Sequence, residues 1–269
     1  MIIDGRKIAL EILDEVSLMV KELSLPPHLT VFSCAPNFET KKFLAIKQKK
    51  ATLVGIEITV IEFDETTKLP DMISALATAD KTSDGIVVQL PFPPAIKIQT
   101  LLGKISLQKD VDALSYDGIS VEILPPVVGA IEVIAKNYQI DFLNKKVAVV
   151  GNGRLVGAPA FLYAQHKGAR VELVQKNTEN SSEIIKDADI LILGAGVPGL
   201  ITPDLVKEGV IVFDAGTSEE GGMLVGDAEP EVASKAKLLT PVPGGIGPIA
   251  IAILLRNLVF LTKNNRKKT

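Results

Sequence analysis

A glycine-rich turn between an apolar run and a helical stretch has the residue types that bind a dinucleotide phosphate. Residues 147–150 are a short, β-rich apolar run, and Leu155 to Gln165 has the pattern of a helix. Gly151 and Gly153 between them can adopt backbone angles closed to other residues, and a helix N-terminus offers unpaired N–H groups and a positive dipole end. Gly157 falls one residue later than G-x-G-x-x-G requires, so a ligand-free glycine turn stays an alternative.

The chain before this turn is predicted to alternate helices with strands. Asp4 is a suitable N-cap for an amphipathic helix that ends at Pro26-Pro27. Strands are expected at 29–33, 56–63 and 85–90, and further helices at 38–54, 71–78 and 95–102.

The chain after this turn continues the same alternation. A helix at 127–138 precedes the turn, and a long apolar helix at 246–261 comes last. Strands at 169–174, 190–193 and 210–213, with helices between them, indicate a second parallel sheet with right-handed crossovers. The sequence therefore predicts an α/β protein.

Composition limits the class of protein. A chain of 269 residues is long enough for two domains. A net charge of −3 gives no reason to expect nucleic acid as a partner, and one cysteine excludes an internal disulfide. His28 and His166 lie far apart, so no metal site is expected. No uncharged run of about eighteen apolar residues and no signal peptide is apparent. We expect a cytoplasmic protein that does not bind a membrane.

Three motifs resemble one enzyme family in order and spacing. They are the nine residues TPVPGGIGP at 240–248, the ten residues DGIVVQLPFP at 84–93, and KDVD at 109–112. They resemble the bifunctional methylenetetrahydrofolate dehydrogenase/methenyltetrahydrofolate cyclohydrolase family over nearly the whole chain. The resemblance implies oxidation of 5,10-methylenetetrahydrofolate with NAD(P)⁺, and hydrolysis of the methenyl product to 10-formyltetrahydrofolate, in one-carbon metabolism.

The resemblance implies three catalytic residues, which are Lys47, Gln89 and Asp112. The family's helical motif S-x-x-Y-V-x-x-K aligns with residues 40–47, which places Phe43 and Lys47 one helical turn apart. An amine that transfers protons near neutral pH needs a pKa lowered by burial, and Gln89 can orient it without adding charge. Without the resemblance, Lys47 would be interpreted as one of several solvated lysines on this helix.

The family's pterin-binding acid aligns with Asp112, whose carboxylate can face two donors of an aminopyrimidinone. Asp110 is interpreted as a surface loop acid, and the same interpretation stays the alternative for Asp112. Phe43 replaces the family's tyrosine and lacks its hydroxyl, and Ala113 replaces the glycine that follows the KDVD motif. The further substrate-binding residues implied by the resemblance are Thr40, Phe43, Leu90, Pro243, Gly244 and Gly245.

The cofactor motifs depart most from the family pattern, because the Arg-Ser pair of the glycine turn is missing. No acid follows the second strand of this half, and Lys176 there favours the extra phosphate of NADP, with NAD and a merely exposed lysine as the alternatives. The cofactor-binding residues implied are Gly151, Asn152, Gly153, Lys176, Gly194, Gly196 and Ile246.

These inferences lead to a two-domain organisation. Residues 1–120, completed by the helix 246–269, are expected to form an α/β folate-binding catalytic domain. Residues 121–245 are expected to form a Rossmann-like NAD(P)-binding domain with a parallel sheet, and the active site is expected in the cleft between the domains.

The resemblance also implies a homodimer. Two alternatives remain: a monofunctional dehydrogenase, suggested by Phe43, and a catalytically silent folate or nucleotide sensor, suggested by the altered cofactor motifs.

Overall fold

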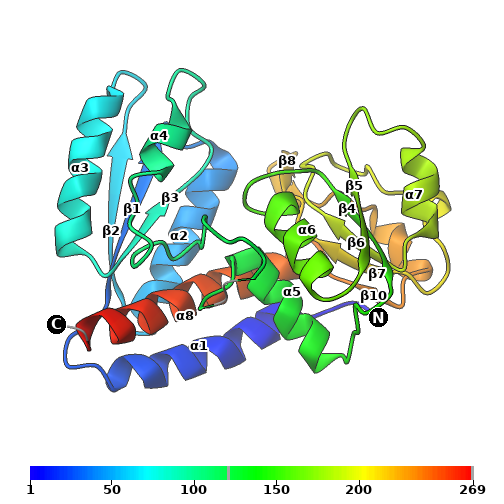
Figure 1. Cartoon of the computed structure of the whole chain (residues 1–269), viewed down its shortest axis with the longest axis horizontal. Helices are drawn as coiled ribbons and strands as arrows, with labels where there is room; N and C mark the ends of the chain where they lie inside the picture. The colour runs from blue at the N-terminus through cyan, green and yellow to red at the C-terminus, as the bar shows by residue number, and fades with distance from the viewer. Residues whose placement is uncertain (120–121, 268–269) are drawn as a thin grey trace. The chain divides into compact units, whose positions relative to one another are not determined.

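A computed structural model describes residues 1–119 and 122–267, and the chain divides into two compact units (Figure 1). The five-stranded unit contains residues 1–9 and 116–250, and the three-stranded unit contains residues 10–115 and the chain from Ile251 onward. Helices α1 (Gly5–Lys21) and α8 (Ile246–Arg266) contribute residues to both units. The domain boundary expected at 120/121, and the last two residues of the expected helix 246–269, lie outside the described residues.

A parallel sheet in the order β2-β1-β3 forms the centre of the three-stranded unit. Its buried face packs against helices through a cluster that includes Phe32, Met72 and Leu101. Cys34 ends β1 with its thiol buried, and its Sγ donates to the carbonyl of Asp64 at 3.4 Å. The elements are β1 (His28–Cys34), α2 (Phe38–Leu53), β2 (Glu57–Phe63), α3 (Leu69–Thr82), β3 (Gly85–Val88) and α4 (Ile98–Leu102).

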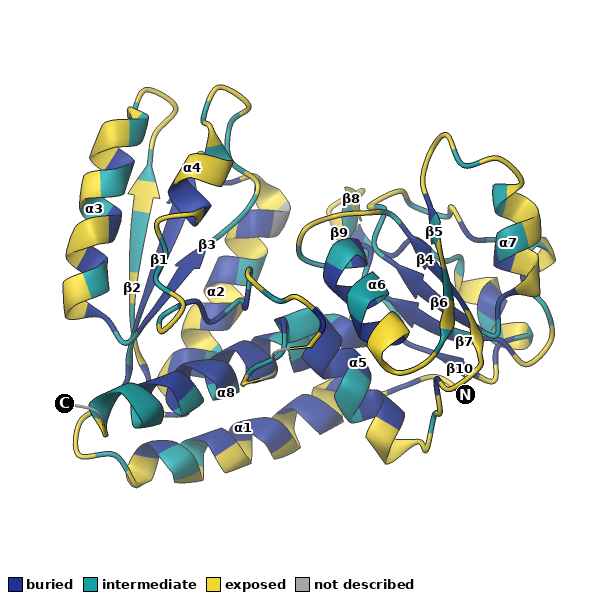
Figure 2. Cartoon of the chain, in the orientation of Figure 1, coloured by how far each residue is buried: buried dark blue, intermediate teal, exposed yellow. Residues whose placement is uncertain are grey.

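The two helices shared between the units differ in burial (Figure 2). In α1, Asp4 accepts the N–H groups of Arg6 and Lys7 at 3.1 Å each, which confirms the predicted cap. Among the described helices, α8 is the one long and apolar enough to cross a bilayer, but 67% of its most apolar window is buried within the protein. Burial of that extent is typical of a core helix.

The five-stranded unit has an all-parallel sheet in the order β10-β7-β6-β4-β5. The chain leaves β4 toward β5 on one side and returns to β6 on the other, so the strand order reverses between β4 and β6. Ligands of open α/β sheets bind at the carboxyl end of such a reversal. The elements are α5 (Pro126–Asn137), β4 (Lys146–Val150), α6 (Gly157–His166), β5 (Arg170–Val174), α7 (Ser181–Asp187), β6 (Ile190–Leu193), β7 (Ile211–Asp214), β8 (Ser218–Glu220), β9 (Met223–Val225) and β10 (Leu238–Leu239), with 3₁₀ turns at Pro203–Leu205 and Pro230–Ser234.

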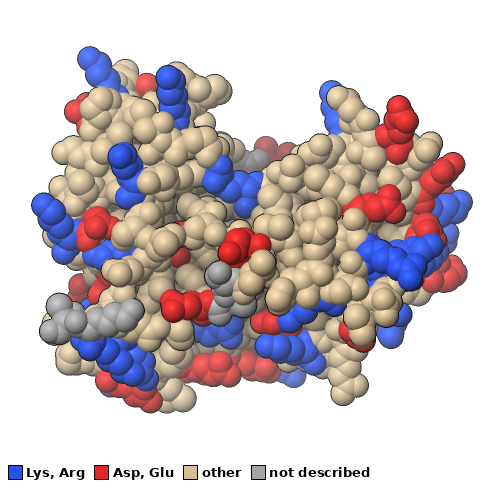
Figure 3. Space-filling view, viewed as in Figure 1, with Lys and Arg blue, Asp and Glu red and all other residues tan. Residues whose placement is uncertain are grey.

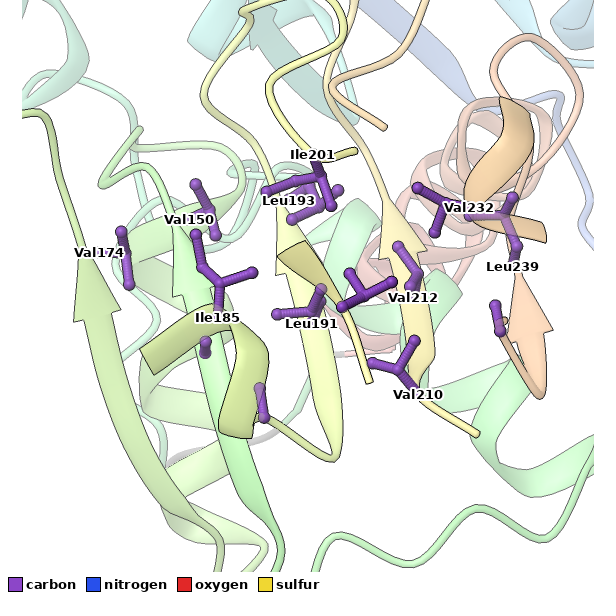
Figure 4. Close-up of a cluster of buried hydrophobic side chains, with 14 residues drawn as sticks. Val150, Val174, Ile185, Leu191, Leu193, Ile201, Val210, Val212, Val232 and Leu239 are labelled. Carbon is purple, nitrogen blue, oxygen red and sulfur yellow. The ribbon is translucent and has the colours of Figure 1, made fainter. Parts of the chain in front are cut away.

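Both faces of the five-stranded sheet are covered by apolar contacts. On one face, Val150, Leu191 and Val212 from three strands belong to one buried cluster with Ile185 of α7 (Figure 4). An aromatic group of Phe142, Tyr163 and Phe213 also packs together, with ring centroids 5.6 and 6.3 Å from that of Phe142. Burial on both faces explains why these strands read as continuous apolar runs.

The predicted strands, and the helices for which bounds were predicted, are present within a few residues of those bounds, but three details differ. Between β6 and β7 the expected helix is replaced by the 3₁₀ turn Pro203–Leu205. The helix after the glycine turn begins at Gly157 rather than Leu155, because residues 154–156 form a further turn closed by the N–H of Ala158 donating to the carbonyl of Gly153. The hairpin β8–β9 and the two-residue strand β10 were not predicted.

On the face displayed in Figure 3, acidic and basic side chains are interspersed rather than grouped by sign.

Candidate active site

Lys47 is buried on α2, with only 5% of its surface exposed. The helix is capped by Asn37, whose side-chain oxygen accepts the N–H of Thr40 at 2.9 Å. Thr40, Leu44, Lys47 and Ala51 are all buried, and their spacing of four, three and four residues places them on one face of the helix. Lys47 therefore differs from the exposed Lys41, Lys42 and Lys49 of the same helix by its position on this inner face.

The amine of Lys47 has a neutral partner. Its Nζ donates to Oε1 of Gln89 at 2.8 Å. Gln89 directly follows β3, and its backbone N–H donates to the carbonyl of Phe32 in β1 at 2.7 Å, which fixes it at the carboxyl edge of the sheet. Lys47 and Gln89, which the family resemblance placed together, are 42 positions apart in the sequence and are brought into contact by the fold.

Burial also changes the acidity of this amine. Desolvation lowers the pKa of Lys47 below its ordinary value, and the carboxylate of Asp112 partly opposes that change. Conversely, burial raises the pKa of Asp112, and Lys47 partly offsets it. The alternative interpretation of Lys47 as a solvated helix lysine is therefore wrong, and its amine can lose a proton more easily than a surface lysine.

The loop that carries Asp112 has an unusual conformation at its next residue. Asp112 is half-buried, and Ala113 has a φ of 50°, in the left-handed region that costs a non-glycine residue about 1 kcal/mol or more. The glycine found there in the resembling family would adopt that angle freely. The substitution to Ala113 thus falls where the loop turns sharply.

Asp110 is buried, which corrects its interpretation as a surface acid. Its Oδ2 accepts the N–H of Leu114 at 2.7 Å, while its Oδ1 has no hydrogen-bond partner among the described residues. Burial, followed by repulsion from Asp112, raises the pKa of Asp110 to about 6. Asp110 therefore closes the loop that holds Asp112.

The remaining expected substrate residues fall into two groups. The first group lies in the three-stranded unit. Thr40 is buried on α2, Phe43 is half-buried one helical turn before Lys47, and Leu90 is half-buried directly after Gln89. Pro243, Gly244 and Gly245 lie in the five-stranded unit between β10 and α8. A Cβ at Gly245 would lie 2.6 Å from the carbonyl oxygen of Pro241, so this turn accepts no side chain there.

The glycine turn after β4 is more tightly packed than expected. Gly151 has a φ of 92°, and a Cβ there would lie 2.6 Å from the carbonyl oxygen of Gly194, which follows β6. A Cβ at Gly157 would collide with the carbonyl of Gly151. Gly153 was expected to use angles closed to other residues, but its φ lies outside the left-handed region and a Cβ would meet only ordinary contacts.

The other expected cofactor residues follow the same strand ends. Asn152 and Lys176 are exposed, and Lys176 comes two residues after β5. Gly196 has a φ of 66° with open space on the side where a Cβ would point. Ile246 is buried at the start of α8, so a ligand would meet its backbone rather than its side chain. Among the described residues no group of three or more His, Cys, Asp or Glu is placed to hold a metal ion.

Sequence reasoning missed two buried acids beside this edge, Asp214 and Asp227. Asp214 ends β7, and Asp227 follows β9. The available sequence signal for their burial was a nearby glycine, because Gly216 follows Asp214 by two residues and Gly226 directly precedes Asp227. In the structure, a Cβ at Gly216 would collide with the carboxylate of Asp227, and a Cβ at Gly226 with that of Asp214.

Comparisons with known proteins cover nearly the whole chain. Residues 3–112 match the catalytic domain of tetrahydrofolate dehydrogenase/cyclohydrolase, and residues 125–266 match the NAD(P)-binding domain of the same family. The bifunctional protein FolD of Nautilia profundicola is 34% identical, with 99% of both chains covered, and bifunctional protein FolD 2 of Lactobacillus johnsonii is 32% identical, with 97% of both covered.

Solved structures agree with these matches. The bifunctional FolD of Campylobacter jejuni superposes with a TM-score of 0.92 at 31% identity, covering 98% of this chain and 99% of the other. The FolD of Trypanosoma brucei, solved with NADP and an inhibitor, superposes with a TM-score of 0.94 at 28% identity, covering 99% and 98%. Two matched domains in the expected order, a two-unit α/β fold and full-length relatives agree: the chain belongs to the tetrahydrofolate dehydrogenase/cyclohydrolase family.

Proposed function

We propose that Lys47, Gln89 and Asp112 carry out the hydrolytic step of the two reactions that this family catalyses. The chain is a methylenetetrahydrofolate dehydrogenase and methenyltetrahydrofolate cyclohydrolase of folate one-carbon metabolism. The observation that supports the assignment is the buried amine of Lys47, 2.8 Å from a neutral amide oxygen and with a lowered pKa.

Hydrolysis of the methenyl cation needs a base and then an acid. As water adds to the methenyl carbon, the neutral amine of Lys47 takes one proton from it. As the bond from that carbon to N5 breaks, Lys47 returns the proton to N5, and the hydroxyl proton leaves to solvent as the formyl group forms. General acid–base catalysis of this kind contributes about 10²- to 10⁴-fold. A neutral amine also avoids repelling the cationic substrate.

Gln89 and Asp112 have separate roles in this proposal. Gln89 holds the amine in place without a charge that would raise its pKa. Asp112 accepts the pterin's ring N–H and amino group, which is the stronger, charge-assisted kind of hydrogen bond. Thr40, Phe43 and Leu90, which lie in the same unit as Gln89 and Asp112, would contact the rest of the folate.

The five-stranded unit fits a nicotinamide dinucleotide. At the strand-order reversal, Gly151 and Gly194 bring two main-chain segments so close that no side chain intervenes, and Gly196 leaves open space beside the loop. When bound, the dinucleotide supplies the ring that accepts a hydride from the methylene carbon. The chain's own contribution to that step is to position the reactants, because no protein group is required to move a proton.

The cofactor we propose is NADP. Lys176 is exposed after β5 and supplies a cation where an acid would favour NAD. The Trypanosoma brucei relative was solved with NADP. Initial rates with each dinucleotide test this choice, and a higher kcat/KM with NAD would overturn it.

We also propose a cytoplasmic homodimer assembled through the five-stranded unit. One edge of its sheet is occupied, because residues 1–3 pair with β10. The strand order leaves β5 at the other edge, and an unpaired edge readily accepts a strand from a second copy. Sedimentation should then give twice the chain mass of 28.7 kDa, and a monomer at micromolar concentration would contradict the proposal.

Lys47→Met tests the proposed hydrolytic role. Methionine keeps the length of the side chain but cannot transfer a proton, so loss of methenyl absorbance with time should slow by at least about 10²-fold. The matched control is Lys49→Met, which removes an exposed amine from the same helix and should leave the rate unchanged. Folate binding should persist in both variants. Unchanged hydrolysis in Lys47→Met would remove this residue from the mechanism.

A further inference from the structure

Asp227 holds three consecutive backbone N–H groups of one loop. Its Oδ2 accepts the N–H of Ala195 at 2.7 Å and that of Gly196 at 3.2 Å, and its Oδ1 accepts the N–H of Val197 at 2.8 Å. The residue has no exposed surface. A buried carboxylate with three donors specifies one backbone conformation, because a rotated peptide would leave either a buried charge or a buried N–H unpaired.

The loop held in this way lies at the reversal of strand order. It follows β6, which is labelled in Figure 1. Gly194, between β6 and this loop, is the residue whose carbonyl oxygen lies next to Gly151. The loop's N–H groups at 195–197 are directed to Asp227 and are not available for a phosphate. Apart from its two chain neighbours, Gly196 has no atom within 4 Å of the position that a Cβ would take. The loop therefore leaves open space beside Gly196, while the side chain of Val197 next to it is exposed.

A second acid, Asp214, fixes the backbone around Asp227. Its Oδ1 accepts the N–H of Gly216 at 2.9 Å and that of Asp227 itself at 3.3 Å, and its Oδ2 accepts the N–H of Ala228 at 2.9 Å. Gly226 makes room for Asp214, since a Cβ there would collide with its carboxylate. The end of β7 is thus connected through two buried acids to the loop after β6.

We propose that Asp227 is a positioning residue for the dinucleotide, which acts through the loop 195–197 without touching the ligand. This inference rests on the proposed binding of the cofactor at Gly194 and Gly196. Its carboxylate keeps the three N–H groups turned inward, so that the open side of Gly196 is available to the cofactor. The alternative is that Asp227 only stabilises the fold.

Asp227→Asn separates these two roles. The amide keeps the shape but presents an NH₂ group to at least one backbone N–H, so the loop must reorganise. We expect the Kd and KM for the dinucleotide to rise at least tenfold, with methenyl hydrolysis within twofold of the parent. Asp204→Asn, an exposed acid of the same unit, should change none of these quantities. Unchanged dinucleotide affinity, or an equal fall of both activities together with the melting temperature, would overturn the proposal.

Gly196→Ala tests the cofactor site independently. Its methyl group would project into the open space beside the loop at a φ of 66°. If both variants weaken the dinucleotide, the proposal stands. If only Gly196→Ala does, Asp227 has a structural role alone. If only Asp227→Asn does, it does not act through this surface, and the proposal fails. If the parent protein binds no dinucleotide, the proposed cofactor site itself is wrong.

Ser218→Ala keeps the test available if Asp227→Asn does not fold. The Oγ of Ser218, on β8, donates to the carbonyl of Gly196 at 3.0 Å. Ser218 thus holds the carbonyl of Gly196, whereas Asp227 holds its N–H. Loss of this one exposed contact should leave the fold intact and raise the Kd for the dinucleotide by two- to fivefold. An unchanged Kd would show that the conformation of this loop does not control binding.

Discussion

The amine of Lys47 lies 2.8 Å from the side-chain oxygen of Gln89, a neutral acceptor at a position where a carboxylate would form an ion pair. Gln89→Glu should therefore raise the pKa of Lys47, because a carboxylate stabilises the ammonium form. The pH–rate profile of methenyl hydrolysis should move to higher pH, and the rate at neutral pH should fall about tenfold if the pKa of the amine rises by about one. Gln48→Glu, exposed on the same helix, should not move the profile. An unmoved profile in Gln89→Glu would contradict the proposed role of the amide.

Asp112→Asn should move the same profile in the opposite direction. The carboxylate of Asp112 raises the pKa of Lys47 against the effect of burial, so its removal lets that pKa fall further. The KM for folate should rise about 10- to 150-fold, since hydrogen bonds to a charged group contribute roughly 1.5–3 kcal/mol. Kinetics over a range of pH measure both effects. Asp71→Asn, an exposed acid, is the control, and an unchanged KM would argue against the pterin contact.

Phe43→Tyr should increase hydrolysis. The ring is one helical turn from Lys47 and half-buried, and a hydroxyl there would give the amine a second polar neighbour. One hydrogen bond of about 0.5–1.5 kcal/mol corresponds to a gain of roughly 2- to 13-fold. Dehydrogenase rates should stay the same. Phe38→Tyr, on the exposed side of α2, controls for added polarity, and a slower hydrolysis in Phe43→Tyr would refute the expectation.

The stability of the protein should depend on pH through Asp214. Burial, together with repulsion from Asp227, raises the pKa of Asp214 to about 6, against the lowering effect of its backbone hydrogen bonds. The folded state therefore binds this proton more tightly than the unfolded chain. The stability contributed by protonation is complete below the ordinary pKa of an aspartate and is lost as pH rises through about 6.

Asp214→Asn should remove this dependence. The difference in unfolding free energy between parent and variant should change by on the order of 3 kcal/mol between pH 3 and pH 7, measured by urea denaturation at each pH. Asp204→Asn should show the opposite sign, because a hydrogen bond from Thr202 lowers the pKa of Asp204. A difference that is constant with pH would show that the pKa of Asp214 is the same in the folded and the unfolded chain, and would contradict the prediction.

The alternation of strands and helices was predictable because buried parallel strands are continuous apolar runs, as Ile190–Leu193 shows. The proposed catalytic pair was predictable only through family spacing, although Lys47 also falls on the inner face defined by Thr40, Leu44 and Ala51. That helical period was a local signal for its burial. The burial of Asp110 had no such signal, since its loop has no regular period.

The contact between Asp227 and the loop 195–197 was not predictable, because it depends on how β6, β7 and β9 are arranged in space. Nothing in the local sequence around Asp227 indicates three backbone donors from a segment about 30 residues away. Likewise, Gly153 looked equivalent to Gly151 in the motif, yet only Gly151 faces the carbonyl of Gly194 at close range. Side-chain roles set by long-range packing require coordinates.

The buried position of Cys34 provides a reporter of local opening. It is the one cysteine in the sequence, and both burial and the acids around it, led by Asp64, raise its pKa, so the folded protein should react slowly with thiol reagents. Because the five-stranded unit contains no cysteine, the alkylation rate would report local opening of the three-stranded sheet alone. Adding folate or dinucleotide during labelling would then show which ligand lowers the alkylation rate and so suppresses opening of that sheet, without any engineered probe.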